Sequence, residues 1–424
     1  MPSAETIMLF AIPMFFVLMG VELFVARIMR RRVYRLNDAI NSIGLGVLSQ
    51  VVGVFSKLLT VGIYAWVVEC VALFDLPTDS VWVWIVALLL YDLCYYWLHR
   101  CGHEVGILWA AHVVHHQSER YNLSTALRQT GSGVLLGWVF YLPMALLGVP
   151  VEVFAVVAVI DLLYQYWIHT ELVPKLGWFD RVFASPSNHR VHHAVNDRYL
   201  DRNYGGIFIL WDRLFGTFAE ERDDEPVVYG TRAPLRSWNP LWANIEVYWA
   251  LAKDAWHARR WRDKLRVWFA RPGWRPADVA ERFPKPAFDI ARNEYDPPVP
   301  AALRAYCFLQ FLVLLGLGTV FLQNAARLSP WAALQSALFL TLGLMTIGAL
   351  LERRRWAIVG EAVRLLWLAL WPTLTAAWPG HEALSRDFGI GFPVFALTSA
   401  AWLLVATLWL ARSAHLPSMA SLKD

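Results

Sequence analysis

Charged residues are scarce in this sequence. Asp, Glu, Lys and Arg together make up 17% of its 424 residues, whereas a soluble domain typically carries about 25%. This scarcity argues against an ordinary soluble protein. The net charge of +4 is modest, and the basic residues gather at the ends of apolar runs. They therefore report membrane topology and contact with phospholipids, and no nucleic-acid partner is expected.

Cysteine is rare as well. The four cysteines are Cys70, Cys94, Cys101 and Cys307, and no two of them form a CxxC pair. This pattern argues against both a disulfide framework and a cysteine-based zinc site. Internal repeats and low-complexity tracts are also lacking.

Long apolar runs are abundant instead, since 57% of the residues are hydrophobic. A bilayer core of about 30 Å needs about 20 apolar helical residues to cross it. The run at 133–168 is interrupted at Gly148-Val149-Pro150, which predicts a helical hairpin. Nine spans result, and the sequence predicts an all-α integral membrane protein with a multi-span helical bundle. The runs cover about 7–26, 44–75, 81–98, 133–168, 303–323, 331–351, 356–376 and 391–411.

The first run has two interpretations, a cleavable signal peptide or a retained span. Its arginine cluster follows the apolar stretch and no small-residue cleavage site comes after it, so a retained span is favoured. Clusters of Lys and Arg mark the cytosolic side, and they occur at 30–35, 99–100 and 352–355. Nine spans satisfy these markers with the N-terminus outside and the C-terminus in the cytosol. A bacterial inner membrane and an endoplasmic reticulum membrane are both compatible.

Three regions follow from these patterns: a catalytic membrane domain at 1–283, a proline-rich linker at 284–300 and a four-span membrane domain at 301–424. Within the first, 247–271 is rich in Trp and Arg, which predicts an amphipathic helix in the lipid headgroups; an ordinary surface helix is the alternative. The last four spans form either a substrate channel or a packing scaffold.

Nine of the 12 histidines fall between 99 and 193, and eight of these form three short groups. The first group is HxxxH and the other two are HxxHH. On a helix these spacings place the rings on one face. All three groups are predicted at the cytosolic ends of spans, in a histidine-rich helical cap. They are His99 and His103; His112, His115 and His116; and His189, His192 and His193.

These histidines predict two metal ions. Uncharged imidazole is a good ligand for iron, zinc or copper, and eight nitrogens are too many for one ion of coordination number four to six. His169 ends an apolar run at the same predicted depth and is either a ninth ligand or a partner of a ligand. A purely structural role explains a lone histidine well but explains this cluster poorly.

The motifs resemble those of the fatty acid hydroxylase and sterol desaturase superfamily, and within it the alkylglycerol monooxygenases. The resemblance lies in HRCGHE (99–104), HVVHHQSERYN (112–122), WIHTE (167–171) and the long run from Asn188 to Phe218. It implies a lipid monooxygenase with two irons, which the eight motif histidines hold. With O₂ such an enzyme hydroxylates a lipid C–H bond and cleaves the ether bond of alkylglycerol lipids. It also implies tetrahydrobiopterin as electron donor, a cofactor for which the residues give no independent sign.

Six further residues are candidates for roles beside the histidines. Metal-bound histidines usually donate their other N–H to a carboxylate or carbonyl, which points to Asp92, Asp161 and Glu119, with Asn188 beside an HxxHH group. A structural hydrogen bond or a helix cap is the alternative for each acid. Glu119 ranks highest because it matches the family motif. Asp201 and Tyr204 are candidates for the substrate or pterin side.

Two other functions compete with ether-lipid cleavage. A fatty-acyl or sterol hydroxylase, or a desaturase, of the same superfamily would use the same ligands, because the outcome depends on which carbon is presented. A membrane metal transporter or sensor is a different class. Transporters place their ligands near mid-membrane on broken spans, whereas these groups are predicted at the cytosolic edge.

Overall fold

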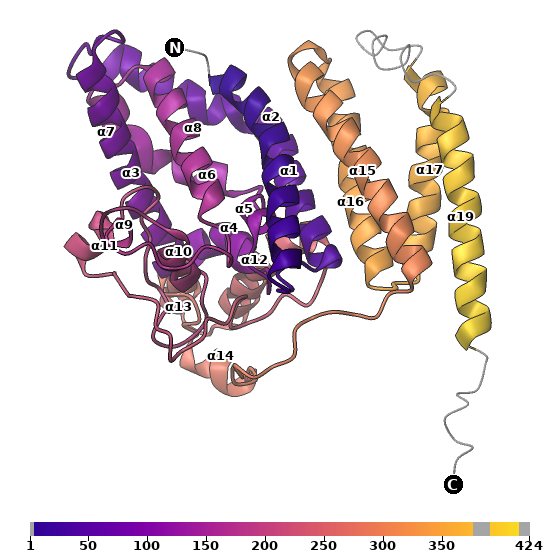
Figure 1. Ribbon diagram of the computed structural model, residues 1–424. Helices are drawn as coiled ribbons and strands as arrows, with labels where there is room; N and C mark the ends of the chain where they lie inside the picture. The colour runs from indigo at the N-terminus through magenta and orange to yellow at the C-terminus, as the bar shows by residue number, and fades with distance from the viewer. Residues whose placement is uncertain (1–3, 376–390, 415–424) are drawn as a thin grey trace. The chain divides into compact units, whose positions relative to one another are not determined.

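The computed structural model describes residues 4–375 and 391–414 (Figure 1). The described residues form helices and no strand, with two isolated bridges, Phe183–Phe208 and Ala194–Tyr229. The predicted all-α class is therefore confirmed. The chain divides into two compact units: unit 1 comprises 1–236 and 242–295, and unit 2 comprises 237–241 and 296–424.

Five helices in the described part of the chain are long and apolar enough to cross a membrane. These helices are what an integral membrane protein requires. Three shorter apolar helices cover Leu59–Val71, Gly133–Leu146 and Gly391–Val405 in the described residues. The count of nine spans and their orientation stay predictions. The five segments are Thr6–Ile28, Leu36–Ser56, Val81–Glu104, Ala301–Arg327 and Pro330–Leu351.

The second span is part of a longer helix than the apolar run indicates. After α1 (Ala4–Ile28), helix α2 runs from Leu36 to Val71. Its 36 residues extend about 54 Å, well beyond a hydrocarbon core of about 30 Å. Its first turns are polar but buried: Ser118 donates to Asp38 over 2.6 Å, and Arg128 donates to Asn41 over 2.7 Å. The first turns of α2 therefore pack against the polar segment that contains Ser118 and Arg128.

Helix α3 (Val81–Glu104) continues beyond the apolar run and carries His99 and His103 itself. It ends at Val105, whose backbone is extended. Helix α4 (Gly106–His116) follows at once, and the Gly106 N–H donates to the Ala270 carbonyl over 2.9 Å. A Cβ on Gly106 would come within 3.0 Å of the Val267 carbonyl oxygen, so glycine permits this close approach.

The hairpin at 133–168 has its turn where it was predicted. Gly148 has a φ of 82°, and a Cβ there would lie 1.8 Å from the Phe74 carbonyl oxygen. The returning arm is the single helix α8 (Val151–Trp167). The first arm is broken into α6 (Gly133–Gly137), the 3₁₀ helix η1 (Trp138–Tyr141) and α7 (Leu142–Leu146).

The single amphipathic helix predicted over 247–271 is wrong, because the structure has two helices there. Helix α12 (Pro240–His257) ends before α13 (Trp261–Phe269) begins. Lys264 donates to the carbonyls of Ala255 and Trp256; these bonds replace helical ones and close α12. The remaining short helices of unit 1 are α5 (Leu123–Ala126), α9 (Phe179–Val182), α10 (Pro186–His192), α11 (Leu210–Phe215) and α14 (Ala277–Arg282).

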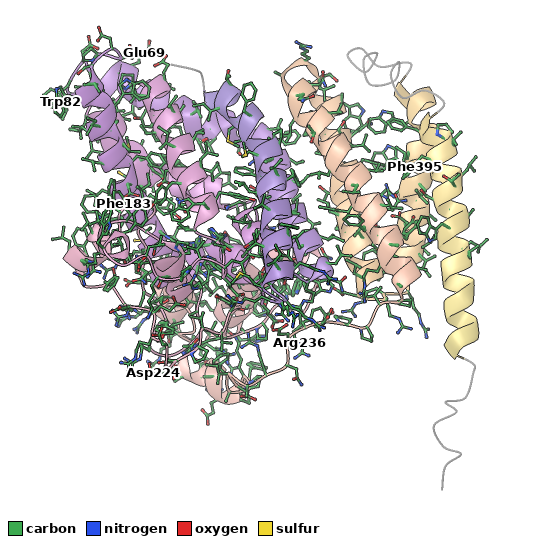
Figure 2. The ribbon with its side chains drawn as sticks, in the orientation of Figure 1. Glu69, Trp82, Phe183, Asp224, Arg236 and Phe395 are labelled. Atoms are coloured by element: carbon green, nitrogen blue, oxygen red, sulfur yellow. The ribbon has the colours of Figure 1, made fainter. Side chains whose placement is uncertain are left out.

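Unit 1 has an apolar end and a polar end. Glu69 and Trp82 lie at one end, where α2 finishes and α3 starts, and Asp224 lies toward the opposite end (Figure 2). The helices α4 and α10, which carry both HxxHH groups, lie toward the Asp224 end (Figure 1). The histidine-rich segments thus share one end of the unit.

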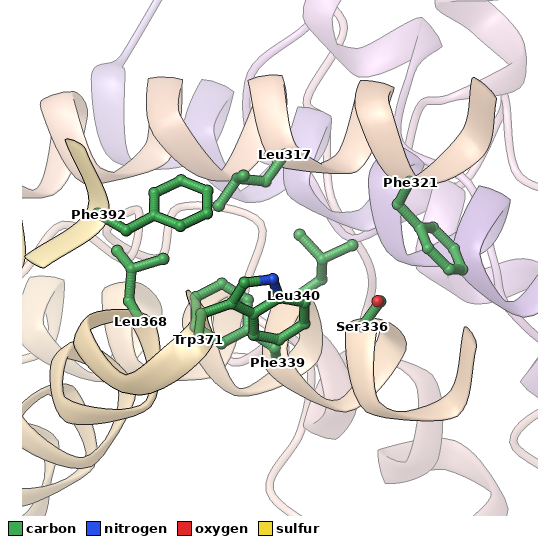
Figure 3. A pocket seen from close by; sticks show the side chains of 8 residues that line it. All are labelled: Leu317, Phe321, Ser336, Phe339, Leu340, Leu368, Trp371 and Phe392. Carbon is green, nitrogen blue, oxygen red and sulfur yellow. The ribbon is translucent and has the colours of Figure 1, made fainter. Parts of the chain in front are cut away.

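Unit 2 contains the four apolar helices that the sequence predicts. A buried ion pair joins Glu361 to Arg364, and Tyr306 donates to Glu361 over 2.6 Å. A small apolar pocket of about 40 Å³, with Phe339 and Trp371 in its wall, lies between the helices (Figure 3). Residue 376, the last of the apolar run 356–376, lies outside the described residues, and so do His381 and His415. The helices are α15 (Ala301–Asn324), continued by η2 (Ala325–Arg327), α16 (Pro330–Leu351), α17 (Trp356–Thr375) and α19 (Gly391–Ala414).

Candidate metal centre

The nine histidines of the cluster come together in two adjoining groups. Within each group, one ring nitrogen of every histidine lies within 4.8 Å of those of the others. The two groups adjoin, because the rings of His116 and His193 stack with their centroids 4.3 Å apart. The first group is His99, His103, His112, His116 and His192; the second group is His115, His169, His189 and His193.

Helical spacing explains how the motifs divide between the groups. Side chains four residues apart on a helix project to the same side, and each i,i+4 pair stays within one group. His112 and His116 join the first group, whereas His115 points to the second. On α10, His189 and His193 join the second group and His192 the first. Each HxxHH motif therefore supplies histidines to both groups.

The nitrogen spacings fit a shared metal ion. The Nε2 atoms of His112 and His116 are 3.1 Å apart, and those of His169 and His189 are also 3.1 Å apart. Two nitrogens bound at about 2.1 Å to one ion are about 3.0 Å apart at a right angle and about 3.4 Å apart at a tetrahedral angle. The donor sets of both groups are thus arranged as metal ligands are.

The opposite ring nitrogens fix the tautomers. Four Nδ1 atoms lie at hydrogen-bonding distance from backbone carbonyls: His99 from Tyr204, His115 from Arg128, His169 from Gln165 and His192 from Arg202, at 2.7–3.0 Å. A carbonyl oxygen only accepts, so each Nδ1 is the protonated nitrogen. The Nε2 lone pairs then face the interior of the groups. The Nε2 atoms of His99 and His192 are buried without a hydrogen-bond partner among the described residues.

The electrostatics also favour metal binding. Burial lowers the pKa of His115 to about 4. For the other cluster histidines outside the membrane spans, burial, and in second place nearby histidines, lower the pKa well below its usual value. The rings are therefore neutral at pH 7 and hold lone pairs available to a cation. These histidines are His112, His116, His169, His189, His192 and His193.

Among the four acidic residues predicted beside the histidines, Asp201 is the one whose carboxylate meets a histidine ring. Its carboxylate is 3.5 Å from His103 Nδ1, and its φ of 57° turns the chain sharply there. It was predicted on the substrate or pterin side. The structure places it against a candidate ligand on the side away from the group, because His103 Nε2 faces His116.

Glu119, which ranked highest from the sequence, lies elsewhere. Its carboxylate accepts from the Tyr295 N–H over 2.6 Å and is 3.8 Å from the guanidinium groups of both Arg35 and Arg292. Asn188 is likewise used for the backbone: its side chain donates to the Asp180 and Phe183 carbonyls. The contacts of Glu119 follow the alternative of structural hydrogen bonding, and the side chain of Asn188 holds backbone carbonyls.

Two buried aspartates hold the loop that carries Tyr204. Asp92 accepts from the N–H groups of Ile207 and Phe208, and Asp212 accepts from those of Tyr204 and Gly205. Asp92 thus acts on His99 through this loop, since the Tyr204 carbonyl faces His99 Nδ1, and not by direct contact with the ring. Asp212 was not predicted as a site residue.

Asp161, the fourth predicted acid, completes this arrangement from α8. It accepts from Gln165 over 2.6 Å, and Gln165 in turn accepts from Tyr95 over 2.7 Å. The backbone carbonyl of Gln165 faces His169 Nδ1. Asp161 is therefore one residue removed from the second group.

Tyr204 lies at the first group. Its ring centroid is 5.3 Å from that of His103, and it is fully buried. Its hydroxyl has no hydrogen-bond partner among the described residues, and burial raises the pKa of the phenol, so it remains protonated. A protonated phenol at this place is a donor available to a bound molecule.

Sequence reasoning missed Tyr121 and Arg128. Tyr121 donates to the Ile168 carbonyl over 2.9 Å, and its ring lies 5.2 Å from that of His193. Arg128 is fully buried, and its guanidinium donates to the Val114 carbonyl over 2.6 Å. The backbone carbonyl of Arg128 is the one that faces His115 Nδ1. An arginine shortly after HxxHH looks like a topology marker, so the pattern carried no sign of this role.

Asp201 and Glu119 give opposite predictions. We expect Asp201→Ala to lower activity about 10–100-fold, which is the usual cost of losing a residue that orients a metal-bound histidine. We expect Glu119→Gln to keep metal content and turnover near wild type, because it contacts the 292–295 segment and not a histidine. Metal analysis and turnover of the two purified variants check this. A larger loss in Glu119→Gln than in Asp201→Ala would contradict these placements.

The comparisons with known proteins agree with this geometry. Residues 84–217 match the fatty acid hydroxylase family, and residues 303–376 match the alkylglycerol monooxygenase C-terminal domain. The chain is 37% identical to the alkylglycerol monooxygenase of Homo sapiens, over 92% of this chain and 87% of that protein. It is 38% identical to that of Danio rerio, over 79% and 75%, and 31% identical to that of Caenorhabditis elegans, over 78% and 69%. No solved structure matches the chain.

Proposed function

Because the chain belongs to the alkylglycerol monooxygenase family and is thus a lipid monooxygenase, we propose that it cleaves the ether bond of alkylglycerol lipids. In this proposal it uses O₂, two iron ions and tetrahydrobiopterin as electron donor. Its family membership leaves the metal transporter or sensor interpretation without support.

The observation that carries the proposal is the pair of all-imidazole groups. Five imidazole nitrogens in the first group and four in the second suit two ions, with positions left for O₂ or water. The family oxidises C–H bonds, which needs a redox-active metal and so argues against zinc. Iron is proposed over copper because the motifs resemble those of a superfamily of two-iron enzymes. When bound, the two irons supply the activation of O₂.

The chain's own residues hold and shield this centre. The Tyr204 and Arg128 carbonyls orient His99 and His115, and all nine histidines are buried or nearly so. Burial keeps bulk water away from the oxidising chemistry. The protonated Tyr204 hydroxyl is a hydrogen-bond donor beside the first group, and we propose that it contacts the substrate or the donor there.

The proposed reaction balances with one two-electron donor. Reduced tetrahydrobiopterin would supply two electrons and two protons, so that one oxygen atom of O₂ would leave as water. The other oxygen enters the C–H bond next to the ether oxygen and forms a hemiacetal. The hemiacetal collapses by breaking its bond to the ether oxygen, which takes the proton, and yields an aldehyde and glycerol.

The histidine-rich segments are proposed to form a cap on the cytosolic side. Arg31, in the basic run after α1, donates to the Glu171 carbonyl over 2.8 Å. The basic run and the segment after His169 therefore lie together. Since Lys and Arg at span ends favour the cytosol, this contact supports a cytosolic cap.

The donor separates this function from its superfamily alternatives. Purified enzyme in lipid nanodiscs is given an alkylglycerol with reduced tetrahydrobiopterin, or with a reduced ferredoxin or cytochrome. We expect aldehyde and glycerol in equal amounts with the pterin only. Full activity with a ferredoxin or cytochrome, or a product that keeps its ether bond, would instead support another hydroxylase or a desaturase.

A further inference from the structure

Unit 1 contains a second feature that the metal centre does not explain, an apolar pocket of about 280 Å³. Its volume is near the lower end of ligand pockets, which is about 300 Å³. Residues of α2, α3, α6, η1, α7 and α8 line it, among them Val61, Leu98, Gly137 and Phe154. No charged residue is among them. We call it the chain pocket.

The chain pocket begins at the depth of the metal centre. Leu98 lines it and directly precedes His99 in α3. Gly137 lies against Leu98, where a Cβ would be 3.2 Å from a Leu98 methyl carbon. From Leu98 the pocket runs toward the apolar end as far as Tyr141, whose ring stacks on Tyr91 at 4.7 Å. Tyr91 is about 10 Å along α3 from Leu98.

The broken arm of the hairpin supports a ligand role. Within a bilayer, irregular backbone is tolerated where it lines a cavity or is buried in protein. The helix changes to 3₁₀ form at Trp138, and Gly133, Gly137 and Trp138 all line the pocket. Glycines and an irregular turn therefore lie where a regular helix with larger side chains would fill the pocket.

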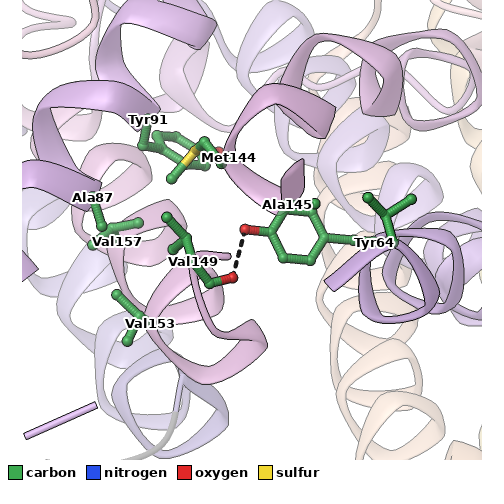
Figure 4. Packing of buried hydrophobic residues seen from close by; sticks show 9 residues of the cluster. Tyr64, Ala87, Tyr91, Met144, Ala145, Val149, Val153 and Val157 are labelled. Carbon is green, nitrogen blue, oxygen red and sulfur yellow. Dashed lines mark hydrogen bonds between the residues drawn. The ribbon is translucent and has the colours of Figure 1, made fainter. Parts of the chain in front are cut away.

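An aromatic cluster forms the far end of the pocket. Tyr64 and Phe154 stack with centroids 4.1 Å apart, and Tyr141 lies 5.6 Å from Phe154. Tyr64 is fixed because its hydroxyl donates to the Val149 carbonyl over 3.0 Å (Figure 4). Met144, Ala145 and Val153 are fully buried in the same apolar cluster as Tyr64. A hydrocarbon chain that extends from Leu98 along the pocket therefore meets these aromatic rings.

We propose that the chain pocket binds the alkyl chain of the lipid substrate, and that Tyr64, Tyr141 and Phe154 set the longest chain it accepts. This inference rests on the proposed function. Val61 lines the pocket and is 44% exposed, so in this proposal the chain enters sideways from the bilayer past Val61. The wall is apolar and adjoins His99, which suits a saturated chain whose polar end stays at the metal centre.

Chain-length preference tests the inference. Each buried methylene gains about 0.8 kcal/mol, which is about fourfold in kcat/KM. For a series of alkylglycerols in nanodiscs we expect this rise until the pocket is full, then a plateau or decline. In Phe154→Ala the pocket is deeper, so the optimum moves to longer chains. The first chain beyond the wild-type optimum should then gain about fourfold relative to wild type.

A second variant covers the case in which Phe154→Ala does not fold. Val61→Trp places a large ring at the mouth and should move the optimum to shorter chains. Leu59→Trp is the matched control, because Leu59 is on the same helix, is 47% exposed and does not line the pocket. Its profile should match wild type. Unchanged profiles in both Phe154→Ala and Val61→Trp, at wild-type metal content, would overturn the inference.

A binding measurement separates this inference from the substrate assignment. An alkylglycerol with a photoreactive group at its chain end is crosslinked to the full-length protein in phosphatidylcholine nanodiscs. We expect labelling of Tyr64, Tyr141 or Phe154 that excess alkylglycerol suppresses. Suppression by added phosphatidylcholine alone means that the pocket holds bulk lipid, and this would overturn the inference. A different outcome is that a lipid of another class suppresses the labelling and is oxidised by the enzyme without ether cleavage. That result contradicts only the proposed substrate and leaves the chain pocket supported.

Discussion

Replacing His192 with alanine is expected to abolish turnover while the protein still inserts and folds. His192 Nδ1 is held by the Arg202 carbonyl over 3.0 Å, and its Nε2 is buried with no partner among the described residues. Alanine removes this nitrogen from the first group. We expect a loss larger than about 100-fold, the upper range for residues that merely orient a ligand. Product formation and metal content of the purified variant measure the effect.

His257→Ala is the matched control. His257 is exposed at the end of α12, far along the chain from the cluster, and its ring contacts Phe283. The same substitution there should leave turnover and metal content near wild type. Wild-type turnover in His192→Ala would contradict the assignment of the first group, and so would an equal loss in both variants.

Gly206→Ala is expected to have the second largest effect, through the loop that supports His99. A Cβ on Gly206 would lie 2.6 Å from Asp161 Oδ1, 2.8 Å from Asp92 Oδ1 and 2.9 Å from a Tyr95 ring carbon. Both carboxylates are fixed by hydrogen bonds, so the loop must move. Overpacking of this kind costs about 1–3 kcal/mol. Because Tyr204 on this loop orients His99, we also expect a 10–100-fold loss of activity, as for other residues behind a metal ligand.

Gly53→Ala separates this effect from a general intolerance of alanine. Gly53 is within α2, and a Cβ there would meet nothing within 4 Å. Alanine favours a helix over glycine by about 1 kcal/mol, so this variant should be at least as stable as wild type and fully active. Thermal unfolding and metal analysis of both variants give the comparison. Full metal content and activity in Gly206→Ala would show that the loop does not position His99.

The sequence alone predicts the parts of the fold that depend on hydrophobic runs and strong turn signals. The helices α1, α15 and α16 follow their apolar runs closely, and the hairpin turns at Gly148 as expected. The start of α2 was not predictable in this way. Its first turns are polar and are buried only because Ser118 and Arg128, more than 75 residues away, cover them.

The cluster of histidines was predictable because the spacing within each motif can be read directly from the sequence. The division of the cluster into two groups was predictable only in part. The i,i+4 pairs indicate which histidines stay together, but which helix faces which depends on packing. The supporting residues were predicted poorly for a physical reason. Carboxylates were sought, whereas four Nδ1 atoms face backbone carbonyls, and every residue has a carbonyl. In the part of the chain that the structure describes, Asp201 is the only residue whose carboxylate meets one of these histidines.

Metal content of the wild-type protein tests the central claim most directly. The full chain is purified without oxygen in lipid nanodiscs, and metals are counted per chain by elemental analysis. The two histidine groups predict two irons per chain in the active enzyme. They also predict that His115→Ala, which removes a nitrogen from the second group alone, lowers that number. A fully active preparation with well under two metals per chain, and the same content in His115→Ala, would contradict the two-metal site.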